Sequence, residues 1–301
     1  MFQRILVPLD GSPFSETALA PAASLAERFG AELLLVRTIL VHVFPGADPG
    51  PAQLEALQKA EQYLDAIARP IKNKGIAVRA AIPYDSPATG IADQAEFRHV
   101  DLIVMSTHGR KWPDTLLHPS ITMGVLEHTT ASILALKGAG EDEEGDQPHL
   151  PRFMVAPGVP ILVPLDGSLL AESALTLAEG LAKSFGNPLL LVSATERPSV
   201  ASTSFDNPAI IAKVEEWAVA ETQSYLLQKQ QEVANRGLRV TIESATGSPA
   251  WFIEECAQAH NAGLVVMTSH GRSGLGRLLL GSVAQTLLRE GEVPVLLVRF
   301  H

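Results

Sequence analysis

"ILVPLDGS" occurs twice in this chain, letter for letter, at residues 5–12 and 161–168. In each copy a branched apolar run is followed directly by a carboxylate, a glycine and a hydroxyl group. The run predicts a buried strand, and the polar residues predict a tight turn that leads into a helix. A second matching pair, "DLIVMSTHGR" at 101–110 and "GLVVMTSHGR" at 263–272, extends the similarity along both halves. The chain is therefore predicted to be a tandem repeat of one domain.

The repeat sets the expected domain boundaries at 1–138 and 159–301, with a linker at 139–158. Five of the six positions 141–146 are carboxylates, and several glycines and prolines surround them. A segment of this composition cannot bury enough apolar surface to order itself. A chain of 301 residues leaves enough length for a core in each copy.

The composition excludes several classes of protein. The net charge is −10 and the pI is about 5.4, so we expect neither nucleic acid nor an anionic membrane as a partner, because both attract basic surfaces. A single cysteine cannot form an internal disulfide. The start "MFQRILVPLD" lacks a signal-peptide layout, and no apolar run reaches the length of a membrane span. These features predict a cytoplasmic protein.

Short apolar runs alternate with longer amphipathic stretches in both copies. This alternation predicts right-handed βαβ crossovers, an α/β fold and a doubly wound, five-stranded parallel sheet in each domain. The expected strand order is 3-2-1-4-5, and ligands in such sheets bind where the order reverses, beyond the carboxyl ends of the strands. The predicted strands are 4–9, 32–38, 76–82, 101–105 and 132–136, then 160–165, 188–194, 238–244, 263–267 and 294–298.

A glycine-rich stretch, "TSHGRSGLGRLLLGSV" at 268–283, follows the fourth strand of the second copy, which ends at Met267. Glycines allow backbone N–H groups to approach an anion, and a helix beginning near Gly281 and Ser282 would add free donors and a positive dipole end. Ser282 is expected to cap that helix and to offer its hydroxyl or amide to a phosphate. Arg272 would add charge, and Asp166 would hold a ribose hydroxyl or a divalent cation. A nucleotide would satisfy all these groups.

The glycine-rich stretch follows the pattern G-x2-G-x9-G-[S/T]. Together with "ILVPLDGS", "SPA" at 248–250 and the terminal "PVLLV", it makes the chain resemble the universal stress protein family in its tandem form. Thr268 stands where that pattern has its first glycine. The resemblance implies homodimers, a role in stress survival, and ATP or AMP bound with Mg²⁺ or Mn²⁺. It places adenine near Pro164, Leu165 and the main chain of Ala194, the ribose and metal at Asp166, and the phosphates at Gly271, Arg272, Gly281, Ser282 and Val283; Met267 and Thr268 complete the expected site.

The first copy departs from this pattern. Its aligned positions are Ser106, Gly109, Pro119 and Ser120, and the loop carries Trp112 and Pro113 where the second copy has Ser273 and Gly274. Proline has no N–H to offer a phosphate, so the first site is predicted to be vestigial and the second to be competent.

Other interpretations of these residues stay open at this point. "LDGS" could be only a strand-to-helix turn capped by Ser168. His108 and His270 are expected to order their loops, Cys256 to pack, and His260 to lack the partners of a metal site. Trp217 and Tyr225 are expected to pack the long helix against the sheet or to line an opening there.

The sequence predicts binding without fast turnover, because the loop lacks the P-loop lysine and no general base is evident. Slow ATP hydrolysis remains open. The expected function is a nucleotide-responsive regulator that signals through conformation or its dimer surface to an unknown protein partner. The alternative is an interaction scaffold of the same fold that binds no nucleotide. A phosphate receiver domain is disfavoured because Asp166 stands alone, without a carboxylate cluster.

Overall fold

The computed structural model describes residues 1–40, 48, 50–107, 121–137, 157–195, 208–269 and 280–299. The chain divides into two compact units: Met1–Pro151 with Arg299–His301, and Arg152–Val298. The division falls inside the segment predicted as the linker. We call the units the first and second domains.

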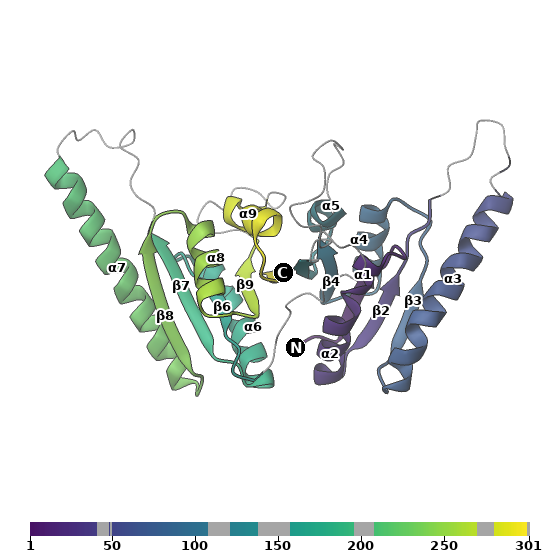
Figure 1. Ribbon diagram of the computed structural model, residues 1–301, viewed down its shortest axis with the longest axis horizontal. Coiled ribbons are helices and arrows are strands. Elements are labelled where there is room, and N and C mark those ends of the chain that lie inside the picture. The colour runs from purple at the N-terminus through teal and green to yellow at the C-terminus, as the bar shows by residue number, and fades with distance from the viewer. Residues whose placement is uncertain are drawn as a thin grey trace, which may run out of the picture. The chain divides into compact units, whose positions relative to one another are not determined.

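The first domain alternates strands and helices along the chain (Figure 1). Its elements are β1 (Arg4–Pro8), α1 (Pro13–Glu16), α2 (Leu19–Phe29), β2 (Glu32–Val36), α3 (Gly50–Asn73), β3 (Val78–Ala81), α4 (Pro87–Phe97), β4 (Leu102–Thr107), α5 (Ile121–His128) and β5 (Ser132–Lys137).

The second domain repeats this order with one continuous helix in place of α1 and α2. Its elements are β6 (Ile161–Pro164), α6 (Leu169–Phe185), β7 (Leu189–Thr195), α7 (Pro208–Asn235), β8 (Val240–Thr246), α8 (Pro249–Ala259), β9 (Leu264–Thr268), α9 (Ser282–Glu290) and β10 (Val295–Val298).

Each domain has the strand order that the repeat predicts. The first sheet runs β3-β2-β1-β4-β5 and the second β8-β7-β6-β9-β10, which is 3-2-1-4-5 in both. The paired strands are parallel, with Ile5 beside Leu33 and Ile161 beside Leu189 in equivalent registers. The prediction of two doubly wound parallel sheets is confirmed. The order reverses between β1 and β4, and again between β6 and β9.

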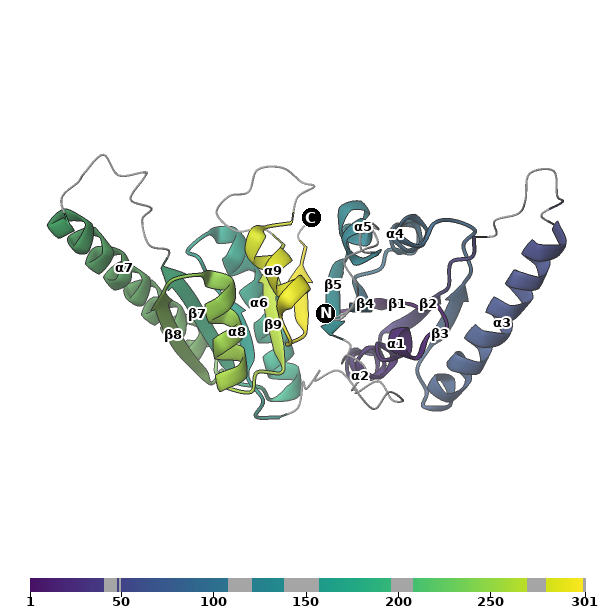
Figure 2. The ribbon, with the colours of Figure 1, turned by 45° about the horizontal axis from the view of Figure 1, so that its top comes forward.

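Helices cover both faces of each sheet (Figures 1 and 2). In the second domain α6 packs on β6 and β9 and α7 on β7 and β8, while α8 contacts α9. Arg236, directly after α7, forms a two-pronged ion pair with Glu179 of α6, with Nε 2.9 Å from Oε2. Glu179 is buried, so this pair and its hydrogen bonds fix how α7 lies along α6.

The central strands form the core of each domain. Ile5, Leu6 and Val7 are fully buried in β1, as are Leu162 and Val163 in β6. Strands covered on both faces need such continuous apolar runs, which explains why β1 and β6 do not alternate polar and apolar residues. The outer strands β3 and β8 are only partly buried.

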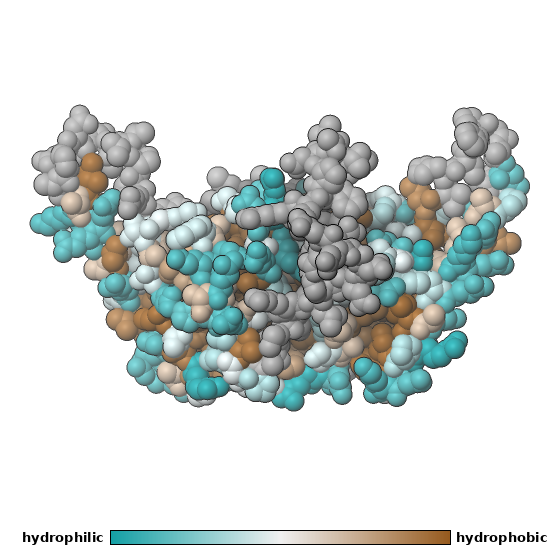
Figure 3. Space-filling view, in the orientation of Figure 1, coloured by the Kyte–Doolittle hydropathy of each residue, from teal (hydrophilic) through white to brown (hydrophobic). Residues whose placement is uncertain are grey.

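On the face seen in Figure 3, hydrophilic residues are interspersed with hydrophobic ones. Trp217 on α7 is 75% exposed, so the prediction that it packs against the sheet is wrong. Tyr225, two turns further along, does reach inward. Among the described residues, no helix is both long and apolar enough to span a membrane.

Because each domain has its own buried sheet, a cavity in one core should destabilise that domain alone. Leu6→Ala and Leu162→Ala remove equivalent, fully buried side chains, and each should cost its own domain about 2–5 kcal/mol. Hydrogen exchange followed by mass spectrometry should show faster exchange in β1, β2 and β4 for the first variant and in β6, β7 and β9 for the second. Equal acceleration of both domains in either variant would show that they unfold as one unit.

Candidate functional site

The predicted site residues that the structure describes meet at the carboxyl ends of β6, β7 and β9. Parallel pairing of β6 with β9 carries both strands to the same edge of the sheet. The main-chain N–H of Gly281 then donates to the carbonyl of Ser269 at 2.8 Å, which fixes the start of α9 beside the end of β9. The residues brought to this edge are Pro164, Leu165, Asp166, Ala194, Met267, Thr268, Gly281, Ser282 and Val283. Gly271, Arg272 and His270 lie outside the described residues, as does His108 in the first domain.

The start of α9 differs from the prediction in one respect. Gly281 is the N-cap, with φ −62° and ψ 149°, and Ser282 is the first helical residue. The expectation that Ser282 caps the helix is therefore wrong. No side chain caps α9 among the residues that the structure describes. Because the Gly281 N–H is engaged with Ser269 and the first intrahelical donor is Gln285, the N–H groups of Ser282, Val283 and Ala284 are the donors in the first turn that the helix cannot satisfy.

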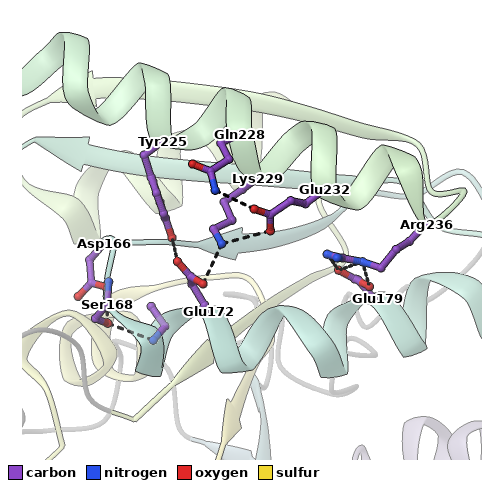
Figure 4. Close-up of polar contacts among 10 residues, drawn as sticks. Asp166, Ser168, Glu172, Glu179, Tyr225, Gln228, Lys229, Glu232 and Arg236 are labelled. Atoms are coloured by element: carbon purple, nitrogen blue, oxygen red, sulfur yellow. Dashed lines mark hydrogen bonds and ion pairs between the residues drawn. The ribbon is translucent and has the colours of Figure 1, made fainter.

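The "LDGS" turn has a structural role of its own. Gly167 has φ 81°, a left-handed conformation that favours glycine. The main-chain N–H and the hydroxyl of Ser168 donate to Oδ1 of Asp166 at 2.9 and 2.6 Å, and Ser168 Oγ accepts the N–H of Ala171 as the N-cap of α6 (Figure 4). The structural interpretation of this turn is confirmed for Ser168. The same contacts orient the Asp166 carboxylate at the predicted crevice.

A polar network that sequence reasoning missed joins α7 to the first turns of α6 (Figure 4). Tyr225 donates to Oε1 of Glu172 at 3.0 Å, and Nζ of Lys229 lies 2.9 Å from Oε2 of the same carboxylate. Lys229 is also 3.2 Å from Glu232. Glu172 lies one helical turn after Ser168, so the network connects the long helix to the turn that holds Asp166.

Burial and hydrogen bonding set the ionisation of this network. Burial raises the pKa of Tyr225 well above its ordinary value, and the hydrogen bond to Glu172 raises it further. Burial alone would lower the pKa of Lys229, but the hydrogen bonds to Glu172 and Glu232 outweigh it and raise that pKa. At neutral pH the network therefore holds a protonated tyrosine and a charged lysine.

A second contact ties α7 to the end of β7. The hydroxyls of Thr195 and Thr222 are 2.9 Å apart, and Thr195 directly follows Ala194, whose main chain is part of the predicted site. The tyrosine and glutamate of the first network recur in the first domain, where Tyr63 donates to Glu16 at 2.9 Å. The sequence repeat could have revealed this contact, because a tyrosine and a glutamate occupy matching positions in both copies.

The first domain repeats the aspartate turn. Oδ1 of Asp10 accepts the N–H and hydroxyl of Ser12 at 2.8 and 2.6 Å. Burial would raise the pKa of Asp10, but the hydrogen bonds from Ser12 and Ser15 exceed it and lower that pKa. Ser106, at the end of β4, shares a 2.7 Å hydrogen bond with Thr17. Gly109, Trp112, Pro113, Pro119 and Ser120 lie outside the described residues.

An arginine distinguishes the two crevices. Arg37 follows β2, and its guanidinium lies over the ring of Tyr63, with Cζ 4.6 Å from the ring centroid. A Cβ atom added to Gly11 would stand only 3.1 Å from the Arg37 guanidinium nitrogens. The side chain therefore lies directly against the aspartate turn. The second domain has Ser193 at the equivalent position, and a serine side chain is too short to make this contact.

Cys256, His260 and Glu243 form a separate cluster in the second domain. Cys256 donates to Oε2 of Glu243 at 3.2 Å, and Nε2 of His260 lies 2.5 Å from Oε1. Burial raises the pKa of Cys256 to about 12, with a further contribution from Glu243. The buried thiol stays protonated, which confirms the packing role. No cluster able to hold a metal ion occurs among the described residues.

Comparison with known proteins agrees with the repeat. The sequence model of the universal stress protein family matches residues 1–137 and 160–299. A universal stress protein of Methanocaldococcus jannaschii is 30% identical over 141 residues, covering 46% of this chain and 81% of that protein. One from Mycobacterium tuberculosis is 26% identical over 310 aligned positions, covering 98% of this chain and 96% of the relative.

A solved structure shares the fold over both domains. The crystal structure of a universal stress protein from Archaeoglobus fulgidus aligns with a TM-score of 0.72 and 21% identity, covering 98% of this chain and 96% of that chain.

The raised pKa of Tyr225 predicts a specific dependence of stability on pH. Its contribution is complete below the ordinary tyrosine pKa of about 10 and is lost as the pH rises through the higher folded-state value, because only the unfolded chain releases the proton in that window. Urea unfolding between pH 9 and 11 should show that Tyr225→Phe loses stability less steeply than the wild type. Identical slopes would mean that Tyr225 ionises normally and that the contact with Glu172 does not persist.

Proposed function

The chain belongs to the universal stress protein family, and we propose that its second domain binds ATP or AMP with a divalent cation, as a stress-response regulator. One observation carries this proposal: the Gly281–Ser269 hydrogen bond sets the uncapped start of α9 at the edge where β6 delivers Asp166. Uncapped N–H groups and a positive helix dipole favour a phosphate group. A carboxylate at the same edge suits a ribose hydroxyl or a cation that bridges phosphates.

The described residues divide into three roles under this proposal. Pro164, Leu165 and the main chain of Ala194 would receive the adenine, and Asp166 would face the ribose and Mg²⁺ or Mn²⁺. The amides of Ser282 and Val283 would hold phosphate oxygens, with Met267 and Thr268 forming the floor at the end of β9. The contribution of Gly281 is the absence of a side chain beside the phosphates, because its N–H already serves Ser269.

The first domain would bind no nucleotide. Arg37 lies against its aspartate turn. Pro119 stands at the position of Gly281, where its ring would take the space that glycine leaves for the phosphates, and it has no N–H for the bond that Gly281 gives to Ser269. The cation–π contact of the guanidinium with the ring of Tyr63 favours this position over release into the solvent. Each chain would therefore hold one nucleotide.

The bound nucleotide would act through α7 rather than through fast chemistry. Thr195–Thr222 and Tyr225–Glu172 join this helix to two sides of the proposed site, so occupancy of the crevice would bias the position of α7. None of the described residues pairs a nucleophile with a general base at this edge, which limits any ATP hydrolysis to a slow rate. We further propose that the protein acts in the cytoplasm as a homodimer.

Two variants of Ser282 distinguish the contribution of its main-chain N–H to nucleotide binding from the contribution of its hydroxyl. Ser282→Pro removes a donor that the helix does not use, at the first helical position, where proline is tolerated; the extended Gly281 that precedes it suits a following proline. Loss of a hydrogen bond to a charged group costs about 1.5–3 kcal/mol, which corresponds to roughly ten- to a hundredfold in Kd. Calorimetric titration with MgATP should show this weakening.

Ser282→Ala is the matched control, because it removes the same hydroxyl and keeps the N–H. It should weaken binding less than Ser282→Pro does. Equal affinity of the proline variant and the wild type would contradict the phosphate assignment. A wild-type chain that binds no nucleotide would favour a protein-interaction scaffold instead, a role consistent with threonine at position 268.

A further inference from the structure

A cavity of about 260 Å³ opens at the amino end of the first sheet, at the opposite end of its strands from the aspartate turn. We call it the arginine cavity, after Arg4, Arg79 and Arg98, which line it together with Glu32 and His99. Arg4 begins β1, Glu32 begins β2, and Arg98 and His99 follow the last residue of α4. The cavity is therefore built from three strands and one helix end of a single domain.

The charges around the arginine cavity do not balance. Glu32 is its lining carboxylate, with Oε1 2.5 Å from Nε of Arg79 and Oε2 3.9 Å from Nε of Arg4. Three guanidinium groups against one carboxylate leave a net charge of about +2, since arginine is always protonated. Asp101 lies nearby, but its carboxylate accepts the main-chain N–H groups of Gln3 and Arg4 and does not line the cavity. This excess is notable in a chain with a net charge of −10.

One donor at the arginine cavity is buried without a partner. Nε of Arg98 is inaccessible to solvent and makes no hydrogen bond, and the same is true of Oε1 of Gln94, one helical turn earlier. Leaving a buried charged donor unsatisfied costs more than the 1–3 kcal/mol typical of a neutral group. Native structures seldom keep such a donor without a role for it.

The second domain shows what the first one lacks. Positions 94 and 98 correspond to Cys256 and His260, which both contact the carboxylate of Glu243. Glu243 pairs in register with Val192 of β7, and its counterpart beside Val36 of β2 is Ala81. The first domain therefore has no carboxylate where the second has one, and it has arginine in place of histidine opposite that position.

We propose that the arginine cavity binds a small dianion that carries a phosphoryl group, which supplies from outside the negative charge that Glu243 supplies in the second domain. A phosphate dianion matches the net charge of about +2, and its oxygens can accept from the outer guanidinium nitrogens of Arg4, Arg79 and Arg98, which places negative charge beside the unpartnered Nε of Arg98. This site is separate from the proposed nucleotide site, because it lies in the other domain and at the amino ends of the strands. Its existence does not depend on nucleotide binding.

The test titrates the full-length chain with inorganic phosphate and compares the wild type with two variants. Arg98→Gln removes the buried donor. Ala81→Glu keeps every arginine and introduces the carboxylate that the second domain has, which should pair with Arg98 as Glu243 pairs with His260 and reduce the excess positive charge from within. Both variants should weaken the phosphate binding seen in the wild type at least tenfold. Ala81→Glu should also raise the thermal unfolding midpoint, which shows that its loss of binding does not come from misfolding.

Lys72→Gln is the matched control, because it removes one exposed positive charge from the first domain outside the cavity; it should bind phosphate as the wild type does. Since each result is a difference between variants, phosphate held at the nucleotide site contributes equally and cancels. Unchanged phosphate binding in both Arg98→Gln and Ala81→Glu, or no binding to the wild type at millimolar phosphate, would overturn the proposal. Tighter binding of succinate than of phosphate would overturn the phosphoryl assignment.

Discussion

The reversal of strand order between neighbouring parallel strands is the constraint on which the rest of this structure depends. β6 and β9 are hydrogen-bonded neighbours at the point where the strand order reverses, and none of the described helices covers the edge between their carboxyl ends. The backbone at that edge must satisfy its own polar groups. The Asp166–Ser168 turn does so on one side, and the Gly281–Ser269 hydrogen bond does so on the other. The amides of the first turn of α9 are the donors that this arrangement leaves over.

The reversal of strand order occurs in both domains of the repeat, but the side chains around it differ between the two. At the carboxyl edge the first domain sets the guanidinium of Arg37 against its aspartate turn, where the second domain has Ser193. Beside β3 and β8 the difference is reversed: the carboxylate of Glu243 contacts Cys256 and His260 in the second domain, whereas the first domain has Ala81 at that position and an unsatisfied Nε in Arg98. Under the two proposals, each domain would take an anion at one place and would fill, with its own side chains, the place equivalent to the other domain's anion site. One tandem chain would then respond to two anions without a change of fold.

Strand order, parallel pairing and the meeting of the aspartate turn with the α9 start could all be predicted from the sequence, because buried strands and repeated turns leave strong local patterns. Three features could not. Helical spacing identifies the apolar face of a helix but not whether another element packs against it, so the exposure of Trp217 does not follow from the sequence. Both glycine and serine favour helix caps, so the register at Gly281 and Ser282 needed backbone geometry. Arg37 and Arg98 acquire their roles from residues far along the chain, which no local pattern records.

We propose that one nucleotide binds per chain, in the second domain, with a metal ion beside Asp166. The decisive experiment measures paramagnetic broadening of assigned amide resonances of the full chain by Mn²⁺ and ATP. The amides of Gly167, Ser282 and Val283 should broaden, while those of Gly11 and Ile121 at the equivalent edge of the first domain should stay sharp. Equal broadening in both domains, or broadening confined to the first, would contradict it.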